Sequence, residues 1–178
     1  TWSASGLGTS IAPVAIADGY LIFLNAYDGK IYSVGKGPSA LSVDAPKAAI
    51  ELGKSLVITG TVTDISAGTQ QEEQAARFPH GVPCVSDESM TPWMEYIYQQ
   101  KPLPTNVTGV TVTLYVVDAN NNYRSIGTAT TDQTGFYSLQ WEPDISGKYT
   151  VYAKFEGSNS YYPSQATTAF AVDEVEAT

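Results

Sequence analysis

The sequence predicts an all-β protein: an immunoglobulin-like β-sandwich with a short helical insertion, preceded by an N-terminal β-hairpin segment. Two observations carry this prediction. Apolar and polar residues alternate along several short segments, as they do in strands with one face in a core. Turn sequences separate these segments about every 8–14 residues, which is the spacing typical of an all-β sandwich.

Composition limits the classes of partner. Charged residues make up 15% of the 178 residues, and 18 acidic residues outnumber 9 basic ones, which gives a formal net charge of −9. We expect no nucleic acid partner and no docking on anionic lipid, because both need lysine and arginine. The apolar runs are shorter than the roughly 20 residues that span a bilayer, so we expect no direct membrane insertion. With no signal peptide and no start methionine, the chain is interpreted as a mature product or a fragment.

Three short apolar segments open the chain as two hairpins, at residues 13–17, 20–24 and 31–34. Asp18-Gly19 is a strong signal for a two-residue hairpin loop, and residues 27–30 form a second turn sequence with a glycine. Residues 35–39 are typical of a linker because they include two glycines and a proline. We therefore assign residues 1–39 to an N-terminal unit, residues 40–174 to the sandwich and residues 175–178 to a tail.

The sandwich strands are predicted at residues 41–45, 49–52, 55–64, 109–118, 123–130, 135–141, 148–157 and 166–172. Because side chains alternate between the two faces of a strand, one face of each strand enters the core. The predicted core residues are Leu56, Ile58, Val62, Val112, Leu114, Trp141, Tyr149 and Val151.

An insertion at residues 67–108 separates two strands that should be neighbours in sequence. Its first half is polar, and we expect a mobile excursion there. Its second half predicts a helix with Thr91 as N-cap and Pro92 as the first helical residue, running to residue 100. The aromatic stripe of this helix favours a cap on the sandwich core. An exposed partner-binding patch of Trp93, Tyr96 and Tyr98 is the alternative.

Candidate metal sites are weak. Asp118, Asn120 and Asn122 have the opening spacing of a calcium loop, but Tyr123 stands where that loop needs glycine, so a hairpin loop is favoured. The pairs Glu72-Glu73 and Asp87-Glu88 are more typical of solvated charge than of a cation site.

No catalytic set is evident in the sequence. His80 is the single histidine and Cys84 the single cysteine, which is too few for a structural zinc set or a Ser–His–Asp triad. We expect no catalytic residue, no metal, no cofactor and no enzymatic activity. For Cys84, a buried thiol is favoured over a disulfide between chains. Asn106-Val107-Thr108 is an acceptor sequence for N-glycosylation at Asn106.

Several segments carry a resemblance to known surface proteins. Residues 131–137 (TDQTGFY), Trp141, Tyr149 and the later aromatic residues resemble the second half of bacterial and archaeal Ig-like surface repeats. In such folds the residue at Tyr149 often forms a tyrosine corner, whose hydroxyl holds a loop backbone. The whole chain is similar to the C-terminal region of archaeal cell-surface proteins with a PQQ-like β-propeller and an Ig-like domain. The segments that carry this similarity are residues 16–32, 35–39, 59–64 and 86–102.

This resemblance implies an extracellular or cell-surface location and an architecture of propeller and Ig-like domain, but it implies no activity. Residues 12–39 resemble part of one propeller blade, which is unable to bury its own apolar face. We therefore expect the N-terminal segment to be covered by other copies of the chain or by further propeller blades. The candidate interface comprises Ile16, Tyr20, Leu21, Ile22, Phe23, Leu24, Ile31 and Tyr32.

The function that follows is an extracellular structural or interaction module. Strand addition between N-terminal segments would make a self-assembling filament or lattice, because a contact that does not close on itself propagates. The alternative is a carbohydrate- or ligand-binding surface module that uses exposed aromatic residues.

Overall fold

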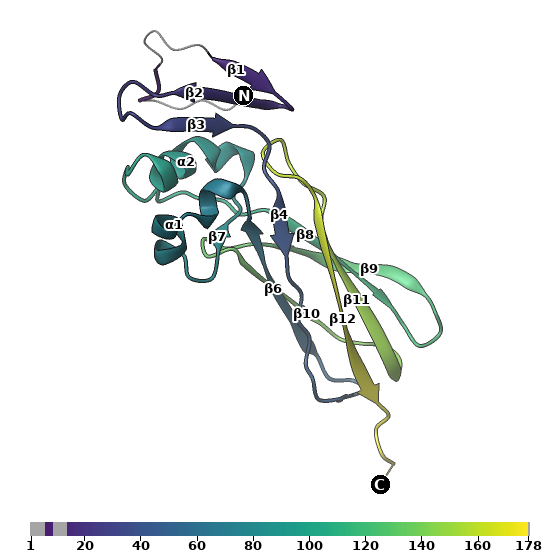
Figure 1. Cartoon of the computed structure of the whole chain (residues 1–178). Helices are drawn as coiled ribbons and strands as arrows, with labels where there is room; N and C mark the ends of the chain where they lie inside the picture. The colour runs from purple at the N-terminus through teal and green to yellow at the C-terminus, as the bar shows by residue number, and fades with distance from the viewer. Residues whose placement is uncertain (1–5, 9–13, 178) are drawn as a thin grey trace.

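The computed structural model of the chain describes residues 6–8 and 14–177, and it contains three β-sheets and a helical insertion (Figure 1). Two sheets form the sandwich. The third sheet lies beyond one end of the sandwich, next to the insertion. The C-terminus lies at the opposite end.

The N-terminal sheet has the antiparallel order β1-β2-β3. Its strands are β1 (Ala15–Ala17), β2 (Tyr20–Leu24) and β3 (Ile31–Val34). The predicted hairpin loop is confirmed, since Asp18 and Gly19 adopt φ angles of 50° and 80° between β1 and β2. These left-handed angles suit a two-residue loop that matches the twist of its strands. Residue 13, in the first predicted strand, lies outside the described residues.

The sandwich is confirmed as an all-β, immunoglobulin-like fold. Its smaller sheet has the order β10-β6-β4, with β7 also paired to β6. These strands are β4 (Ser39–Leu41), β6 (Leu56–Asp64), β7 (Val82–Pro83) and β10 (Phe136–Trp141). Its larger sheet has the order β5-β12-β11-β8-β9. These strands are β5 (Ile50–Glu51), β8 (Thr111–Val117), β9 (Tyr123–Thr130), β11 (Gly147–Phe155) and β12 (Ser164–Asp173).

The core lies between these two sheets, where the alternation predicts it. All the predicted core residues are buried except Trp141, which is half-buried. Trp141 is the last residue of β10, so its ring lies at the end of the core. There it packs edge-on against Tyr149, with 5.4 Å between ring centroids, and the Arg124 guanidinium lies 5.8 Å from its ring centroid.

Tyr149 forms the predicted tyrosine corner. Its hydroxyl donates to Asp144 Oδ1 at 2.9 Å and lies 3.2 Å from both the amide nitrogen and the carbonyl oxygen of Ile145. Its ring stacks on Phe170 at 5.0 Å. The hydroxyl therefore holds the loop before β11 to the core.

The insertion is helical in both halves, so the predicted mobile excursion is wrong. Its first half contains η1 (Ala67–Gln70) and α1 (Glu72–Arg77). Gln74 Nε2 and the Arg77 guanidinium donate to the carbonyl oxygen of Ile97, at 3.2 and 3.1 Å. A six-residue polar helix is too short to show an apolar period, and these contacts to the second helix stabilise it.

The second helix begins earlier than predicted. η2 (Asp87–Ser89) leads directly into α2 (Met90–Tyr98), so Ser89 and not Thr91 is the N-cap residue. Ser89 Oγ accepts a hydrogen bond from the Thr108 amide at 2.9 Å. The helix ends at Tyr98, shortly before Gln100 with its left-handed φ of 55°. Trp93 and Ile97 are buried with the sandwich core, which confirms that this helix caps it.

The predicted linker is instead held against the sandwich. The Gly37 amide donates to the Ser160 carbonyl at 2.9 Å, and the Tyr162 amide donates to the Gly37 carbonyl at 2.8 Å. Ser39 already belongs to β4, so the predicted boundary after residue 39 falls inside a strand. The strand predicted at 41–45 is also shifted: only residue 41 lies in β4, and an isolated bridge joins Asp44 to Thr59.

Candidate interaction surface

The N-terminal sheet has one exposed apolar face. The register pairs Ile22 with Ala15 and Ser33, and it pairs Leu24 with Ile31. Because side chains alternate along each strand, these residues lie on the same side of the sheet. We call this side the outer face; its apolar residues are Ala15, Ala17, Ile22, Leu24 and Ile31, and all five are exposed.

The inner face is covered only in part: Ile16 and Leu21 lie on it and are 79% and 36% exposed, whereas its centre is buried. Phe23 is 8% exposed, and its ring stacks on Tyr32 with 5.8 Å between centroids. Tyr32 lies in β3, the strand of this sheet next to α2 (Figure 1), and its hydroxyl interacts with the Gln99 side chain at the end of α2. Phe23 is therefore buried beside its cross-strand neighbour Tyr32, and the predicted cover of this sheet by other copies of the chain or by further propeller blades stays a prediction.

Tyr32 also holds the turn between β2 and β3. Its hydroxyl donates to Asp28 Oδ2 at 2.6 Å. Burial and this hydrogen bond raise the pKa of Tyr32 to about 12, and the same hydrogen bond lowers the pKa of Asp28. Tyr32 therefore keeps its proton at neutral pH and is a structural donor.

Asn25 is a buried polar anchor that the sequence did not single out. Its side chain is fully buried, accepts from the Gly8 amide at 3.0 Å and donates to the Gly6 carbonyl at 3.1 Å. A buried amide with both groups bonded fixes the backbone that it touches. Asn25 therefore ties residues 6–8 to the end of β2.

Exposed apolar side chains concentrate in this part of the chain. Half of the large hydrophobic residues that are exposed in the described chain lie between residues 14 and 31. They are Val14, Ile16, Leu21, Ile22, Leu24, Tyr27 and Ile31. Ile31 is 77% exposed; it is the first residue of the edge strand β3 and lies at the border of the outer face. Contiguous exposed apolar residues mark interaction sites more often than isolated ones do.

The aromatic patch predicted on the insertion is largely inside the protein. Trp93 is 2% exposed, and its ring lies 5.5 Å from Tyr96 and 6.1 Å from Phe78. The Arg77 guanidinium lies 4.6 Å from the Tyr96 ring centroid. Tyr98 is half-buried, and burial raises its pKa to about 12. These residues therefore bind α1 to α2 and do not form an exposed platform.

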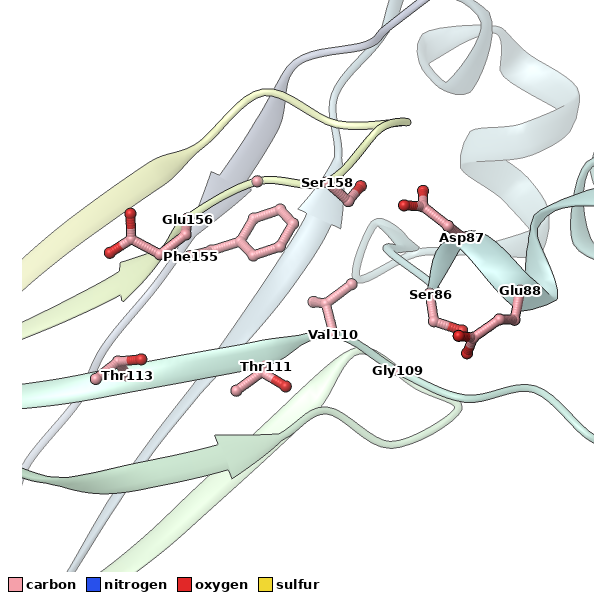
Figure 2. Close-up of a pocket in the computed structure, with 11 residues that line it drawn as sticks. Ser86, Asp87, Glu88, Gly109, Val110, Thr111, Thr113, Phe155, Glu156 and Ser158 are labelled. Atoms are coloured by element: carbon pink, nitrogen blue, oxygen red, sulfur yellow. The ribbon is translucent and has the colours of Figure 1, made fainter. Parts of the chain in front are cut away.

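A hollow of about 340 Å³ lies between η2, β8 and the end of β11 (Figure 2). It has carboxylates from Asp87, Glu88 and Glu156, and it is lined by no basic side chain. Asp87 is already used: its carboxylate accepts from Ser160 Oγ at 2.7 Å and from the Asn159 amide at 3.1 Å. Asp87 is exposed, as the interpretation as solvated charge expects, and it also holds the β11–β12 loop to the insertion.

The remaining candidates have structural roles or lie apart. Asp118 Oδ1 accepts from the amides of Asn120 and Asn122, at 2.9 and 3.0 Å, which confirms the hairpin loop. Cys84 is a buried free thiol, as favoured, whereas His80 is exposed. Asn106 is exposed in a loop, and Glu72 and Glu73 are exposed in the first turn of α1. Within the described residues, no three His, Cys, Asp or Glu side chains gather to hold a metal ion.

One buried carboxyl was missed from the sequence. Asp64, at the end of β6, is buried beneath the insertion, and Oδ1 accepts from the amide and the hydroxyl of Ser66 at 2.9 and 2.6 Å. Burial raises the pKa of Asp64, although the bonds from Ser66 oppose this shift. Asp64 continues the series of inward positions that includes Ile58 and Val62, and this alternation was the signal that its side chain points inward.

Comparisons with known proteins give distant similarities in fold. No protein-family model matches the chain, and no curated protein matches it. Among solved structures, the chain is similar to the fibronectin(III)-like modules of CbhA from Clostridium thermocellum. That match has a TM-score of 0.43 and 12% identity, and it covers 89% of this chain and 64% of the other. A β-glucosidase from Listeria innocua, solved with glucose, matches with a TM-score of 0.33 and 12% identity, over 80% of this chain and 17% of the other.

No helix in the described part of the chain is long and apolar enough to cross a membrane.

Proposed function

We propose that the chain is a structural and interaction module of an archaeal-type cell-surface protein, located outside the cell. Its N-terminal sheet joins another β element, which is either a second copy of the chain or further propeller blades. The outer face supports this proposal, because its apolar residues Ile22, Leu24 and Ile31 remain exposed. Burying them against a partner would contribute about 25 cal/mol per Å² of apolar area.

Two versions of this function differ in what the partner is. In the first, N-terminal sheets of different copies associate and produce a filament or lattice subunit. In the second, the sheet is the last part of a propeller, and the sandwich is held at a fixed angle to that propeller by α2 and residues 37–39. The hydrogen bonds of Gly37 with Ser160 and Tyr162 hold the segment after the N-terminal sheet to the sandwich, as both versions need.

The double variant Ile22→Ser/Ile31→Ser tests the surface. In the self-assembly version, light scattering should show large particles for the wild-type chain and monomers for the variant. Val57→Ser/Phe136→Ser is the matched control, because these residues are exposed on the smaller sandwich sheet. A wild-type chain that stays monomeric at high concentration would contradict self-assembly and favour the propeller version. Equal assembly of both variants would show that the outer face is not the interface.

Exposed Asn106 fits the same location. Its acceptor sequence lies in a loop, and the Asn106 side chain that would carry the glycan is exposed. Mass spectrometry of the protein from its natural source should find a glycan on Asn106; a peptide without one would remove this support for an extracellular site.

A further inference from the structure

The outer surface of the larger sandwich sheet carries a cluster of three tyrosines. The register places Tyr152 of β11 directly opposite Tyr115 of β8, and Tyr123 of β9 lies opposite Val117, the next outward residue of β8. Alternate residues of these strands, such as Val116 and Val151, enter the core. The three tyrosines therefore lie side by side on the face away from the core.

Their rings are in contact and partly exposed. Tyr115 and Tyr123 stack nearly parallel, with 5.2 Å between centroids and an interplanar angle of 6°. The Tyr152 ring meets Tyr123 at 6.2 Å and 60°. Tyr123 is 53% exposed and is the first residue of β9. The β8–β9 hairpin points away from the N-terminal sheet (Figure 1). Preformed contacts reduce the entropy that such side chains lose when a ligand binds.

One lysine completes the cluster. Lys154 Nζ lies 5.0 Å from the Tyr115 ring centroid and 5.9 Å from that of Tyr123, and it is 3.4 Å from the Tyr123 hydroxyl. The ammonium group is therefore held over the rings, where it can donate to an additional oxygen atom.

The surroundings of the cluster are rich in hydroxyl groups, and Glu156, two residues after Lys154, is a carboxylate that interacts with the Lys154 ammonium. β8, β9 and β11 contain no acidic residue, although the chain has 18 of them. Ser125 lies opposite Tyr115 in the register, and Gln165 lies opposite Lys154. The neighbouring outward positions are threonines, namely Thr111, Thr113, Thr128, Thr130, Thr150 and Thr167.

We propose that this surface, formed by Tyr115, Tyr123, Tyr152 and Lys154, binds a neutral polysaccharide. Sugar rings present apolar C–H faces, which pack on aromatic rings, and hydroxyl groups, which pair with hydroxyls, amides and ammonium groups. A sheet face whose strands contribute no carboxylate matches a neutral, extended, hydroxyl-rich chain. A polyanion is opposed by the net charge of −9. The smaller sheet also has outward threonines, but none of the aromatic contacts found among the described residues lies on its outer face.

Affinity electrophoresis of the full chain tests this proposal. Native gels would contain a neutral polysaccharide: hydroxyethyl cellulose, dextran or mannan. We expect at least one to retard the wild-type chain, and Tyr123→Ala and Tyr152→Ala to weaken that binding by roughly 3- to 10-fold. Tyr123→Phe should retain most of the effect, because the ring stays. Both sites are on the surface, and thermal unfolding would verify that the variants remain folded.

Tyr162→Ala is the matched control. Tyr162 is 49% exposed and has Lys36 Nζ 4.9 Å from its ring centroid, but it lies in the β11–β12 loop. This variant should bind like the wild type. The proposal is overturned if no neutral polysaccharide retards the chain, if the alanine variants bind as the wild type does, or if only an anionic polysaccharide such as alginate is bound.

Discussion

The sandwich and the N-terminal sheet are built from similar short apolar strands, but they differ in what covers those strands. Each sandwich sheet covers the other, so Ile58, Leu114 and Val151 lose all contact with solvent. The N-terminal sheet has only a partial cover on its inner face and none among the described residues on its outer face, where Ile22, Leu24 and Ile31 stay exposed. Apolar content alone therefore does not define a core; a core also needs a second layer. The predictions below test this contrast.

The largest effect is expected for Leu114→Ala, in the middle of β8. The cavity and the lost apolar contacts should lower the free energy of unfolding by about 2–5 kcal/mol. Leu24→Ala removes the same atoms from the outer face and should cost less than about 1 kcal/mol. Urea denaturation of both variants measures the difference. Equal losses would mean that the outer face is as well covered as the core.

Asn25→Ala should act locally. It leaves the Gly8 amide and the Gly6 carbonyl without their partner, which costs about 1–3 kcal/mol where these groups are buried. Hydrogen exchange should therefore speed up at Gly8 and along β2 and β3, but not in β8 or β11. Faster exchange throughout the sandwich would show that the two regions unfold as one unit.

Tyr149→Phe removes the hydroxyl of the tyrosine corner and keeps the ring. The lost hydrogen bonds to Asp144 and Ile145 should cost about 0.5–1.5 kcal/mol each at most, because Asp144 is exposed and can bond to water. Thermal unfolding of the variant and the wild type measures this loss of stability. Tyr152→Phe, on the outside of the same strand, should change stability very little; a larger loss there would contradict the assigned faces.

The smallest change in the free energy of unfolding, at acid pH, is expected for Asp64→Asn. Because burial raises the pKa of Asp64 above the unfolded value of 3.8, its favourable contribution is fully present below pH 3.8 and is lost as the pH rises through the folded pKa. Each unit of the raised pKa corresponds to about 1.4 kcal/mol. The stability of Asp64→Asn relative to the wild type should therefore increase from pH 3.5 to pH 7. A constant difference over this range would mean that the pKa is not raised.

The sandwich could be predicted from local patterns, because its strands obey simple alternation. The period of two along residues 55–64 and 109–118 fixes which side chains face inward, whatever the partner sheet is. The Asp18-Gly19 loop and the tyrosine corner at Tyr149 are likewise set by residues close in sequence. These features needed no knowledge of distant contacts.

The helix α1, the hydrogen bonds of Gly37 and the position of Tyr32 beside α2 depend on residues far away in the chain. Gln74 reaches Ile97, Gly37 reaches Ser160, and Tyr32 reaches Gln99. The sequence near these residues does not predict such partners, because polar side chains and glycines fit many environments. The tyrosine cluster was missed for the same reason, because three strands must align before Tyr115, Tyr123 and Tyr152 meet.

The sequence by itself determined the strands, their inward faces and the presence of a helix that caps the core, because alternation and turn residues act over a few positions. Only the tertiary structure decided which apolar surfaces are covered. That outcome depends on how sheets and helices are placed against one another, and it separates Trp93, which is buried, from Ile31, which is exposed.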